Sequence, residues 1–238
     1  FSTLGLSTMD AVLADPVCVP AGEERWFTER VWRLPYTRLC MVPPLAATEV
    51  VPTPALRQGH ITYGSFQDMA KITDEVLATW GRIAQAVPTA RFRIQVRFLD
   101  AEPDRRARFE ARLEAVGLAL SRVSLHSNTS FKDYFAAHGD IDVLLDTFPY
   151  PGGTTTAHAI WMGVPTISLA RPGMLARQGA GLLSAAGLHD WVVNTPDAYV
   201  AKAVAWAQPQ RWSELNALRL GLRERARRSP LFDGQRFG

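Results

Sequence analysis

From residue 60 onward, short apolar runs of strand length alternate with longer amphipathic stretches of helical length. The pattern predicts strands at residues 61–66, 92–98, 123–126, 143–146, 166–169 and 191–193. It predicts helices at residues 73–86, 103–116, 131–138, 154–162, 174–186, 196–207 and 211–227. Regular alternation of the two element types is typical of a parallel sheet covered by helices on both faces. We therefore expect an α/β fold, a Rossmann-like doubly wound parallel sheet.

The region before residue 60 lacks this alternation. Residues 39–59 contain four prolines, at positions 43, 44, 52 and 54, and show little periodicity, which is typical of a linker or an extended crossing segment. The sequence thus divides into residues 1–38, a linker at residues 39–59, and a sheet-forming unit at residues 60–238. Because the chain begins with Phe1 rather than Met, we expect a true amino terminus to be missing.

Composition excludes several broad classes of protein. With 47% hydrophobic and 21% charged residues, the chain is typical of a globular rather than a disordered protein. No run of about 18 apolar residues occurs, so we expect a soluble protein without a membrane span. Cys18 and Cys40 are the only cysteines and form no CxxC pair, which argues against a disulfide framework or a zinc site. Reduced thiols in a cytoplasmic protein are the expectation.

Arginines gather at residues 105–112 and 223–228, and the formal net charge is +3. Nucleic-acid binding is one interpretation of such clusters. Acidic residues are interleaved with the arginines, however, at positions 104, 110, 114 and 224, which suits solvated helix faces with ion pairs one turn apart. We therefore expect no nucleic-acid partner.

The most informative motif is residues 144–165, which predict a buried strand, a Pro/Gly turn, a helix opening on Thr154, Thr155 and Thr156, and a second strand. Such a helix start presents free backbone N–H groups, and Gly152 and Gly153 let another molecule approach the backbone closely. Residues 154–160 contain no Asp or Glu to meet the positive end of the helix dipole. The motif predicts an anion site that suits a phosphate. Helix capping by the threonines and an ordinary glycine turn would produce the same pattern.

Three predicted loops follow strand ends and carry polar groups: residues 67–71, which include Lys71, residues 127–130, and residues 151–155. In doubly wound sheets, ligands bind beyond the carboxyl ends of the strands, where the strand order reverses. We therefore expect the three loops to converge on one site. The first would supply a cation, the second backbone polar groups, and the third a helix dipole.

Several segments, in this order and spacing, resemble one known family. They are Gly64-Ser65-Phe66 followed by Lys71, residues 142–150, Gly152 with Thr154-Thr155, residues 161–165 and residues 229–232. Through these segments the chain is similar to the carboxyl-terminal catalytic lobe of O-linked N-acetylglucosamine transferase-like proteins of glycosyltransferase family 41, in their bacterial, SPINDLY-like form. The resemblance implies the second lobe of a GT-B glycosyltransferase, with residues 1–38 as a remnant of the amino-terminal catalytic lobe. Many members carry tetratricopeptide repeats ahead of these lobes.

The resemblance also implies a function. Family members transfer a sugar to a polypeptide, so we expect metal-independent, inverting transfer of N-acetylglucosamine or glucose from a UDP-sugar, with no further cofactor. Lys71 matches the lysine that contacts the diphosphate, where its ammonium would stabilise the leaving group; a solvated surface lysine is the alternative. No general base is evident, so the isolated chain is expected to bind UDP and to transfer little sugar. A non-catalytic nucleotide-binding module and a UDP-sugar epimerase are the other interpretations.

The resemblance implies these donor-binding residues: Gly64, Asp68, Thr129, Tyr134, Gly152, Gly153, Thr154, Thr155, His158 and Arg177. Thr154 and Thr155 would hold the diphosphate. The backbone at Thr129 would address the uracil ring, and Tyr134 would lie near the nucleotide. Tyr134 equally suits a core position on an aromatic helix face.

Three positions depart from the family pattern. Gly153 stands where many members have His or Thr, His158 where many have an acidic residue that bonds the ribose, and Asp68 where animal members have an amide. A neutral imidazole accepts or donates one hydrogen bond at a time, whereas a carboxylate accepts two. Arg177 stands where an arginine is usual; it would pack against the site or orient the donor, and the alternative is an ordinary arginine of a helix start.

Overall fold

The computed structural model describes residues 3–6 and 8–237. Its largest element is a six-stranded sheet in the order β5-β4-β3-β6-β7-β8, in which every neighbouring pair is parallel. The strands are β3 (Thr62–Ser65), β4 (Arg91–Gln95), β5 (Val123–His126), β6 (Val143–Leu145), β7 (Thr166–Leu169) and β8 (Val192–Val193). The order of the strands reverses between β3 and β6. This is the doubly wound arrangement that the sequence predicts.

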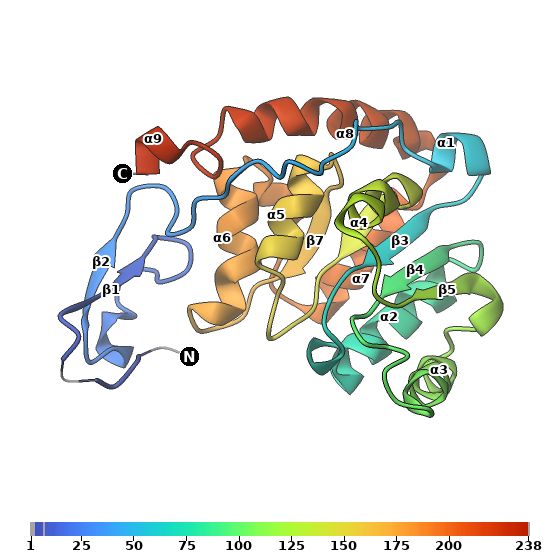
Figure 1. Cartoon of the computed structure of the whole chain (residues 1–238), viewed down its shortest axis with the longest axis horizontal. Helices are drawn as coiled ribbons and strands as arrows, with labels where there is room; N and C mark the ends of the chain where they lie inside the picture. Colours follow the sequence, from blue (N-terminus) through green and yellow to red (C-terminus); the bar gives the residue numbers. More distant parts are fainter. Residues whose placement is uncertain (1–2, 7, 238) are drawn as a thin grey trace.

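Helices pack on this sheet in two groups (Figure 1). They are α2 (Asp74–Ala86), α3 (Arg105–Ala115), α4 (Phe131–Ala136), α5 (Thr154–Trp161), α6 (Gln178–Ala185), α7 (Pro196–Trp206) and α8 (Trp212–Arg227). Helix α2 packs against α3 and α7, whereas α5 packs against α6 and α8. None of the helices in the described ranges combines the length and the apolar character needed to cross a membrane. The predicted α/β fold class is confirmed.

Some element boundaries differ from the prediction. The strand predicted at residues 92–98 ends at Gln95, because Phe98 takes a φ of 57° and its N–H donates to Asn128 Oδ1 at 2.9 Å. The helix predicted at residues 174–186 is a 3₁₀ turn, Leu175–Arg177, followed by α6. Apolar periodicity continues through both breaks, so the local pattern could not predict them.

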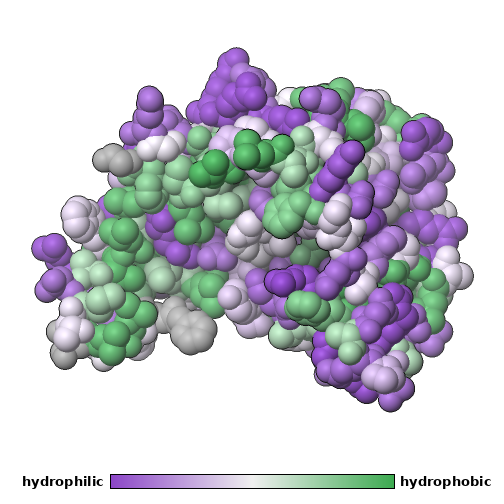
Figure 2. Space-filling view, viewed as in Figure 1, coloured by the Kyte–Doolittle hydropathy of each residue, from purple (hydrophilic) through white to green (hydrophobic). Residues whose placement is uncertain are grey.

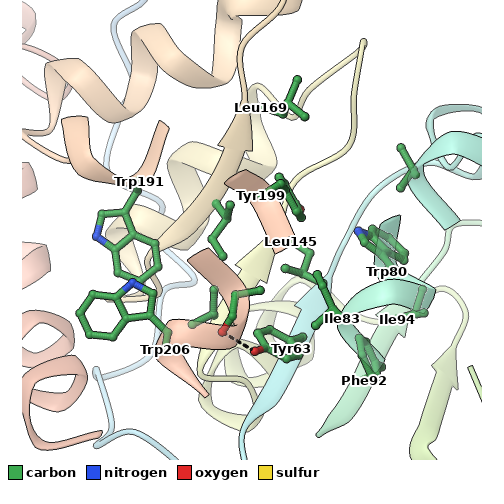
Figure 3. Packing of buried hydrophobic residues seen from close by; sticks show 14 of the residues in the cluster. Tyr63, Trp80, Ile83, Phe92, Ile94, Leu145, Leu169, Trp191, Tyr199 and Trp206 are labelled. Atoms are coloured by element: carbon green, nitrogen blue, oxygen red, sulfur yellow. Dashed lines mark hydrogen bonds between the residues drawn. The ribbon is translucent and has the colours of Figure 1, made fainter. Parts of the chain in front are cut away.

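Buried aromatic side chains hold the sheet and its helices together (Figure 3). The Tyr63 hydroxyl on β3 donates to the Ala203 carbonyl oxygen on α7 at 2.8 Å. The Trp191 and Trp206 rings stack with their centroids 4.9 Å apart. Burying an apolar side chain of this kind contributes about 1.5–3 kcal/mol. These contacts fix the positions of the strands whose carboxyl ends form the candidate site.

Residues 39–54 contain no helix or strand and lead to the short helix α1 (Ala55–Gln58) (Figure 1). Two arginines of α8 hold this segment: Arg223 Nη2 donates to Thr48 O at 2.5 Å, and Arg219 Nε donates to Val51 O at 2.6 Å. The Ala55 N–H donates to Asp142 Oδ1 at 2.9 Å. The segment is therefore bonded to the sheet-forming unit, while the predicted division into domains stays a prediction.

A second, two-stranded parallel sheet precedes the linker, formed by β1 (Ala11–Ala14) and β2 (Arg30–Arg33). It lies at the α6 end of the molecule in Figure 1. Its cross-strand partners Leu13 and Trp32 are 50% and 56% exposed. Apolar side chains gather on this end of the surface, whereas the end around α3 is hydrophilic (Figure 2). The side of the small sheet that carries Leu13 and Trp32 is thus left uncovered.

Candidate functional site

The carboxyl ends of β3 and β6 lie side by side, where the order of the strands reverses. Two of the three predicted loops, residues 67–71 and 151–155, meet there. Lys71 Nζ donates to Pro151 O at 3.2 Å, and Gln67 Nε2 donates to Thr155 Oγ1 at 3.0 Å. The structure therefore brings the predicted cation and the start of α5 to one place.

Asp146, the residue after β6, organises the turn that leads to α5. Its side chain is fully buried. Oδ1 accepts from the N–H groups of Thr147 at 3.0 Å and Gly152 at 2.7 Å, and Oδ2 accepts from Ser168 Oγ at 2.7 Å. Burial raises its pKa from 3.8 to about 6, although these donors and the Lys71 charge favour the ionised form. The carboxylate lies beneath the turn and binds the Gly152 N–H, ahead of the helix start.

Gly152 and Gly153 allow side chains of the protein to approach this turn closely. A Cβ on Gly152 would lie 2.4 Å from Thr155 Oγ1, and a Cβ on Gly153 would lie 2.7 Å from Gln178 Nε2. The sequence predicts that these glycines admit another molecule. In the structure, polar side chains occupy the space beside both α-carbons, so a ligand would meet the N–H groups that follow.

Helix α5 begins at Thr154 with no acidic residue in its first turn and no side-chain cap. The Ala157 N–H donates to Gly153 O at 3.1 Å, whereas the N–H groups of Thr154, Thr155 and Thr156 find no acceptor in the described part of the chain. Thr156 Oγ1 is buried and also lacks a partner there. Free N–H groups at the positive end of a helix form an anion site.

Lys71 supplies positive charge beside this helix start. Its half-buried ammonium lies 4.0 Å from the centroid of the Tyr150 ring. Burial lowers the pKa of Lys71 from 10.5, while the nearby carboxylates of Asp146 and Asp68 oppose that shift. The ammonium thus faces the loop before α5 rather than open solvent, as the sequence predicts.

The family is decided by comparison with known proteins. The profile of glycosyl transferase family 41 matches residues 50–238, which is most of the chain. This chain belongs to glycosyl transferase family 41.

Curated relatives agree with this assignment to family 41. SPINDLY of Solanum lycopersicum, named a probable UDP-N-acetylglucosamine--peptide N-acetylglucosaminyltransferase, is 37% identical over 99% of this chain. SPINDLY of Arabidopsis thaliana carries the same description and is also 37% identical over 99% of the chain. The chain spans 25% of the length of the first relative and 26% of the second.

Solved structures show the family 41 fold. A mutant of the O-GlcNAc transferase of Thermobaculum terrenum superposes with a TM-score of 0.86 at 33% identity, covering 96% of this chain and 43% of that one. Sucrose-phosphate synthase of Thermosynechococcus elongatus reaches a TM-score of 0.61 at 16% identity, covering 96% of this chain and 55% of that one, which shows a shared fold alone. The large sheet is thus a lobe of the GT-B type.

Tyr134 and His158 of this family 41 chain lie together on α4 and α5. The Tyr134 hydroxyl is 3.2 Å from His158 Nδ1, and the Phe135 ring packs 4.8 Å from the imidazole. Burial lowers the pKa of His158, which favours the neutral imidazole. Tyr134 belongs to an aromatic cluster, and its hydroxyl points to α5. A contact of either residue with a nucleotide stays a prediction.

Three other predicted site residues have different surroundings. Gly64 lies within β3, and a Cβ there would lie 2.3 Å from Ile141 Cδ1, so this glycine lets Ile141 pack on the sheet. Asp68 is exposed, and its Oδ1 caps a 3₁₀ turn by accepting from the Ala70 N–H at 3.0 Å. Thr129 is exposed in the loop between β5 and α4. The structure gives Gly64 and Asp68 structural roles, and donor binding by the three stays a prediction.

The Arg177 side chain is directed to the amino-terminal segment. Nη1 and Nη2 each donate to the Glu23 carboxylate at 2.6 Å, and Nη1 also donates to Cys18 O at 3.4 Å. This ion pair raises the pKa of Arg177 and lowers that of Glu23. Arg177 therefore joins the start of α6 to the segment around β1, which differs from the expected place beside a donor.

The sequence reasoning missed Gln67, Ser168 and Gly179. Gln67 is 3% exposed and reaches both Thr155 and Asp146. A Cβ on Gly179 would lie 2.2 Å from Ser168 Oγ and 2.6 Å from Asp146 Oδ2. Gln67 comes shortly after β3 and Ser168 lies within β7, and a polar residue beside or within an apolar strand is a signal that the sequence contains. In the described ranges, no three His, Cys, Asp or Glu side chains are grouped as metal ligands.

Proposed function

We propose that this chain binds a nucleoside-diphosphate sugar at the amino end of α5 and forms half of the active site of a protein glycosyltransferase. The observation that carries the proposal is the start of α5, where free N–H groups and the Lys71 ammonium adjoin one another and no acidic residue lies in the first turn. The family relatives named as UDP-N-acetylglucosamine--peptide N-acetylglucosaminyltransferases support it.

In the proposed reaction, a hydroxyl of the polypeptide acceptor attacks the anomeric carbon of the sugar. The new C–O bond forms on one face while the bond to the diphosphate breaks on the other, so the anomeric configuration inverts. The leaving diphosphate gains negative charge, which Lys71 and the N–H groups of Thr154 and Thr155 stabilise without a metal. The acceptor proton passes to a base outside the residues placed at this site.

We infer UDP as the nucleotide and N-acetylglucosamine or glucose as the sugar. The acceptor is a polypeptide and no nucleic acid takes part. We place the reaction in the cytoplasm, where the free cysteines Cys18 and Cys40 would stay reduced. Because no general base is among the site residues, residues 1–238 alone are expected to bind UDP and to transfer little sugar to a peptide. Rapid transfer by this chain in a radiolabelled UDP-sugar assay would contradict that expectation.

Titration calorimetry with UDP, GDP and TDP tests the site. UDP is expected to bind best, and Lys71→Ala is expected to weaken UDP binding by about 1–3 kcal/mol, since it removes a charge-assisted hydrogen bond. Lys132→Ala, at an exposed position on α4, is the matched control and should leave the affinity unchanged.

Thr155 offers a second variant at the same site. Thr155→Val removes the hydroxyl that accepts from Gln67, and it is expected to weaken UDP binding by about 1 kcal/mol or more, whereas Thr155→Ser keeps the hydroxyl and the affinity. Equal binding of UDP by the wild type and Lys71→Ala would reject the site. A preference for GDP or TDP would change the donor and leave the site in place.

A further inference from the structure

Gln178, the first residue of α6, covers the turn before α5. Its Nε2 lies 2.7 Å from the place where a Cβ of residue 153 would stand, and its Oε1 lies 3.9 Å from the same place. The amide group thus fills the space that a side chain at position 153 would need.

Arg38 fixes which way this amide faces. Arg38 Nη2 donates to Gln178 Oε1 at 3.0 Å. Because a guanidinium has donors only, Oε1 must face Arg38, and Nε2 is then turned toward Gly153 and the start of α5. Gln178 Nε2 finds no acceptor among residues 3–6 and 8–237.

The position of Arg38 is itself fixed by the amino-terminal segment. Its backbone N–H donates to the buried Asp15 at 3.1 Å through Oδ2. Its Nε is buried and has no partner in the described part of the chain. Next to it, the ion pair between Arg177 and Glu23 ties the same segment to α6. Arg38 therefore acts on the turn from outside the large sheet, through one amide.

We propose that Gln178 is a diphosphate-binding residue, whose Nε2 donates to a phosphate oxygen at the start of α5, and that Arg38 is the positioning residue that holds the amide in this orientation. The inference rests on the proposed function and extends it to α6, whose first residue lies against Gly153. The amide of residue 178 takes the space that a side chain at position 153 would need, and its Nε2 supplies a donor there.

The geometry leads to a test that separates phosphate contact from a loss of structure. UDP and uridine share the base and the ribose, but only UDP has the diphosphate, so the ratio of their affinities reports on phosphate contacts. Gln178→Glu keeps the size of the side chain and an oxygen for Arg38, but it places negative charge at the diphosphate. We expect UDP affinity to fall about tenfold or more and uridine affinity to change less than about twofold.

Three further variants complete the measurement. Gln178→Met removes the donor and should reduce UDP affinity about fivefold or more. Arg38→Met should reduce it in the wild-type background and have little further effect in Gln178→Met, because Arg38 acts through the amide. Gln208→Glu makes the same change of charge at an exposed position just after α7 and is the matched control. Circular dichroism melting checks that each variant is folded.

The outcomes are distinguishable from failure of the proposed function. If the wild type binds none of UDP, GDP and TDP, the proposed function fails. If GDP or TDP binds instead, the same ratio is measured with that nucleotide and its nucleoside. If the wild type binds the nucleotide and the folded Gln178 variants bind it equally well, or lose nucleotide and nucleoside affinity in parallel, the role of Gln178 is rejected. Independent effects of Arg38→Met and Gln178→Met would reject the positioning role of Arg38.

Discussion

Single buried groups near the site have shifted pKa values, and burial is the main cause. The pKa of Asp146 is raised from 3.8 to about 6 even though several donors surround its carboxylate. His138 is fully buried and stacks on Phe66 with ring centroids 4.4 Å apart. Its pKa is lowered from 6.5 to about 3. In both cases the interior disfavours the charged form. As the pH falls, the raised pKa of Asp146 increases the stability of the fold and the lowered pKa of His138 decreases it, so mutation of each residue can separate the two effects.

His138 is predicted to make the protein sensitive to mild acid. Its folded pKa lies below its unfolded value, so the stabilisation is complete above pH 6.5 and is lost as the pH falls toward 3. Relative to His138→Asn, the wild type should lose up to about 1.4 kcal/mol of unfolding free energy per pH unit below pH 6. Urea denaturation of both proteins from pH 7 to pH 5 measures this difference. Parallel pH profiles would contradict the prediction.

Two arginines of helix α8, Arg219 and Arg223, donate hydrogen bonds to backbone carbonyl oxygens of other segments. Arg219 is 1% exposed and donates to three carbonyl oxygens, those of Val51 at 2.6 Å, Ile141 at 2.7 Å and His138 at 2.7 Å. Burial lowers its pKa from 12.5 to about 10, so it stays charged at pH 7. One side chain thus connects the linker, the start of β6 and the end of α4.

Arg219→Met is expected to lower the unfolding free energy by about 3–5 kcal/mol, because it leaves the buried carbonyl groups of Ile141 and His138 without a donor and breaks the bond to Val51 O. Arg225→Met, at an exposed position on the same helix, should change it by less than about 0.5 kcal/mol. Chemical denaturation gives both values. A loss at Arg219 no larger than at Arg225 would show that the linker does not depend on this contact.

At the scale of the whole molecule, the small amino-terminal sheet is joined to the large unit at the start of α6. Cys18 is 1% exposed, and its Sγ lies 3.6 Å from Arg177 O. Burial and the nearby Asp15 raise its thiol pKa to about 12. Together with the ion pair between Arg177 and Glu23, this contact joins residues that are far apart in sequence. The start of α6 is therefore shared by the candidate site and the amino-terminal segment.

Arg177→Met is predicted to loosen this junction. In a Cys40→Ser background, the rate of maleimide labelling of Cys18 should rise several-fold, because a buried thiol with a raised pKa reacts only when the segment opens. UDP affinity should fall no further than it does in Arg38→Met, since the Arg177 guanidinium bonds to Glu23 and can act on the start of α5 only through Arg38 and Gln178. Arg171→Met, which breaks an ion pair with Glu75 elsewhere, is the control. If Arg177→Met lost much UDP affinity while the labelling rate of Cys18 stayed unchanged, Arg177 would instead have the role beside the donor that the sequence predicts.

The sequence by itself determined the alternation of strands and helices, and with it the doubly wound sheet, because apolar periodicity is a local property of each element. It also predicted the place of the candidate anion site, since Lys71 and the start of α5 both follow strand ends that such a topology brings together.

Only the tertiary structure decided which side chains surround that site. Ile141 packs over Gly64, Gln178 covers Gly153, and Arg177 turns to Glu23. Arg38 reaches Gln178 across 140 positions of sequence, in a contact that no periodicity encodes. Side-chain contacts of this kind depend on how separate elements pack, on the space that glycines leave and on which buried donors still need acceptors, and those conditions exist only in the folded chain.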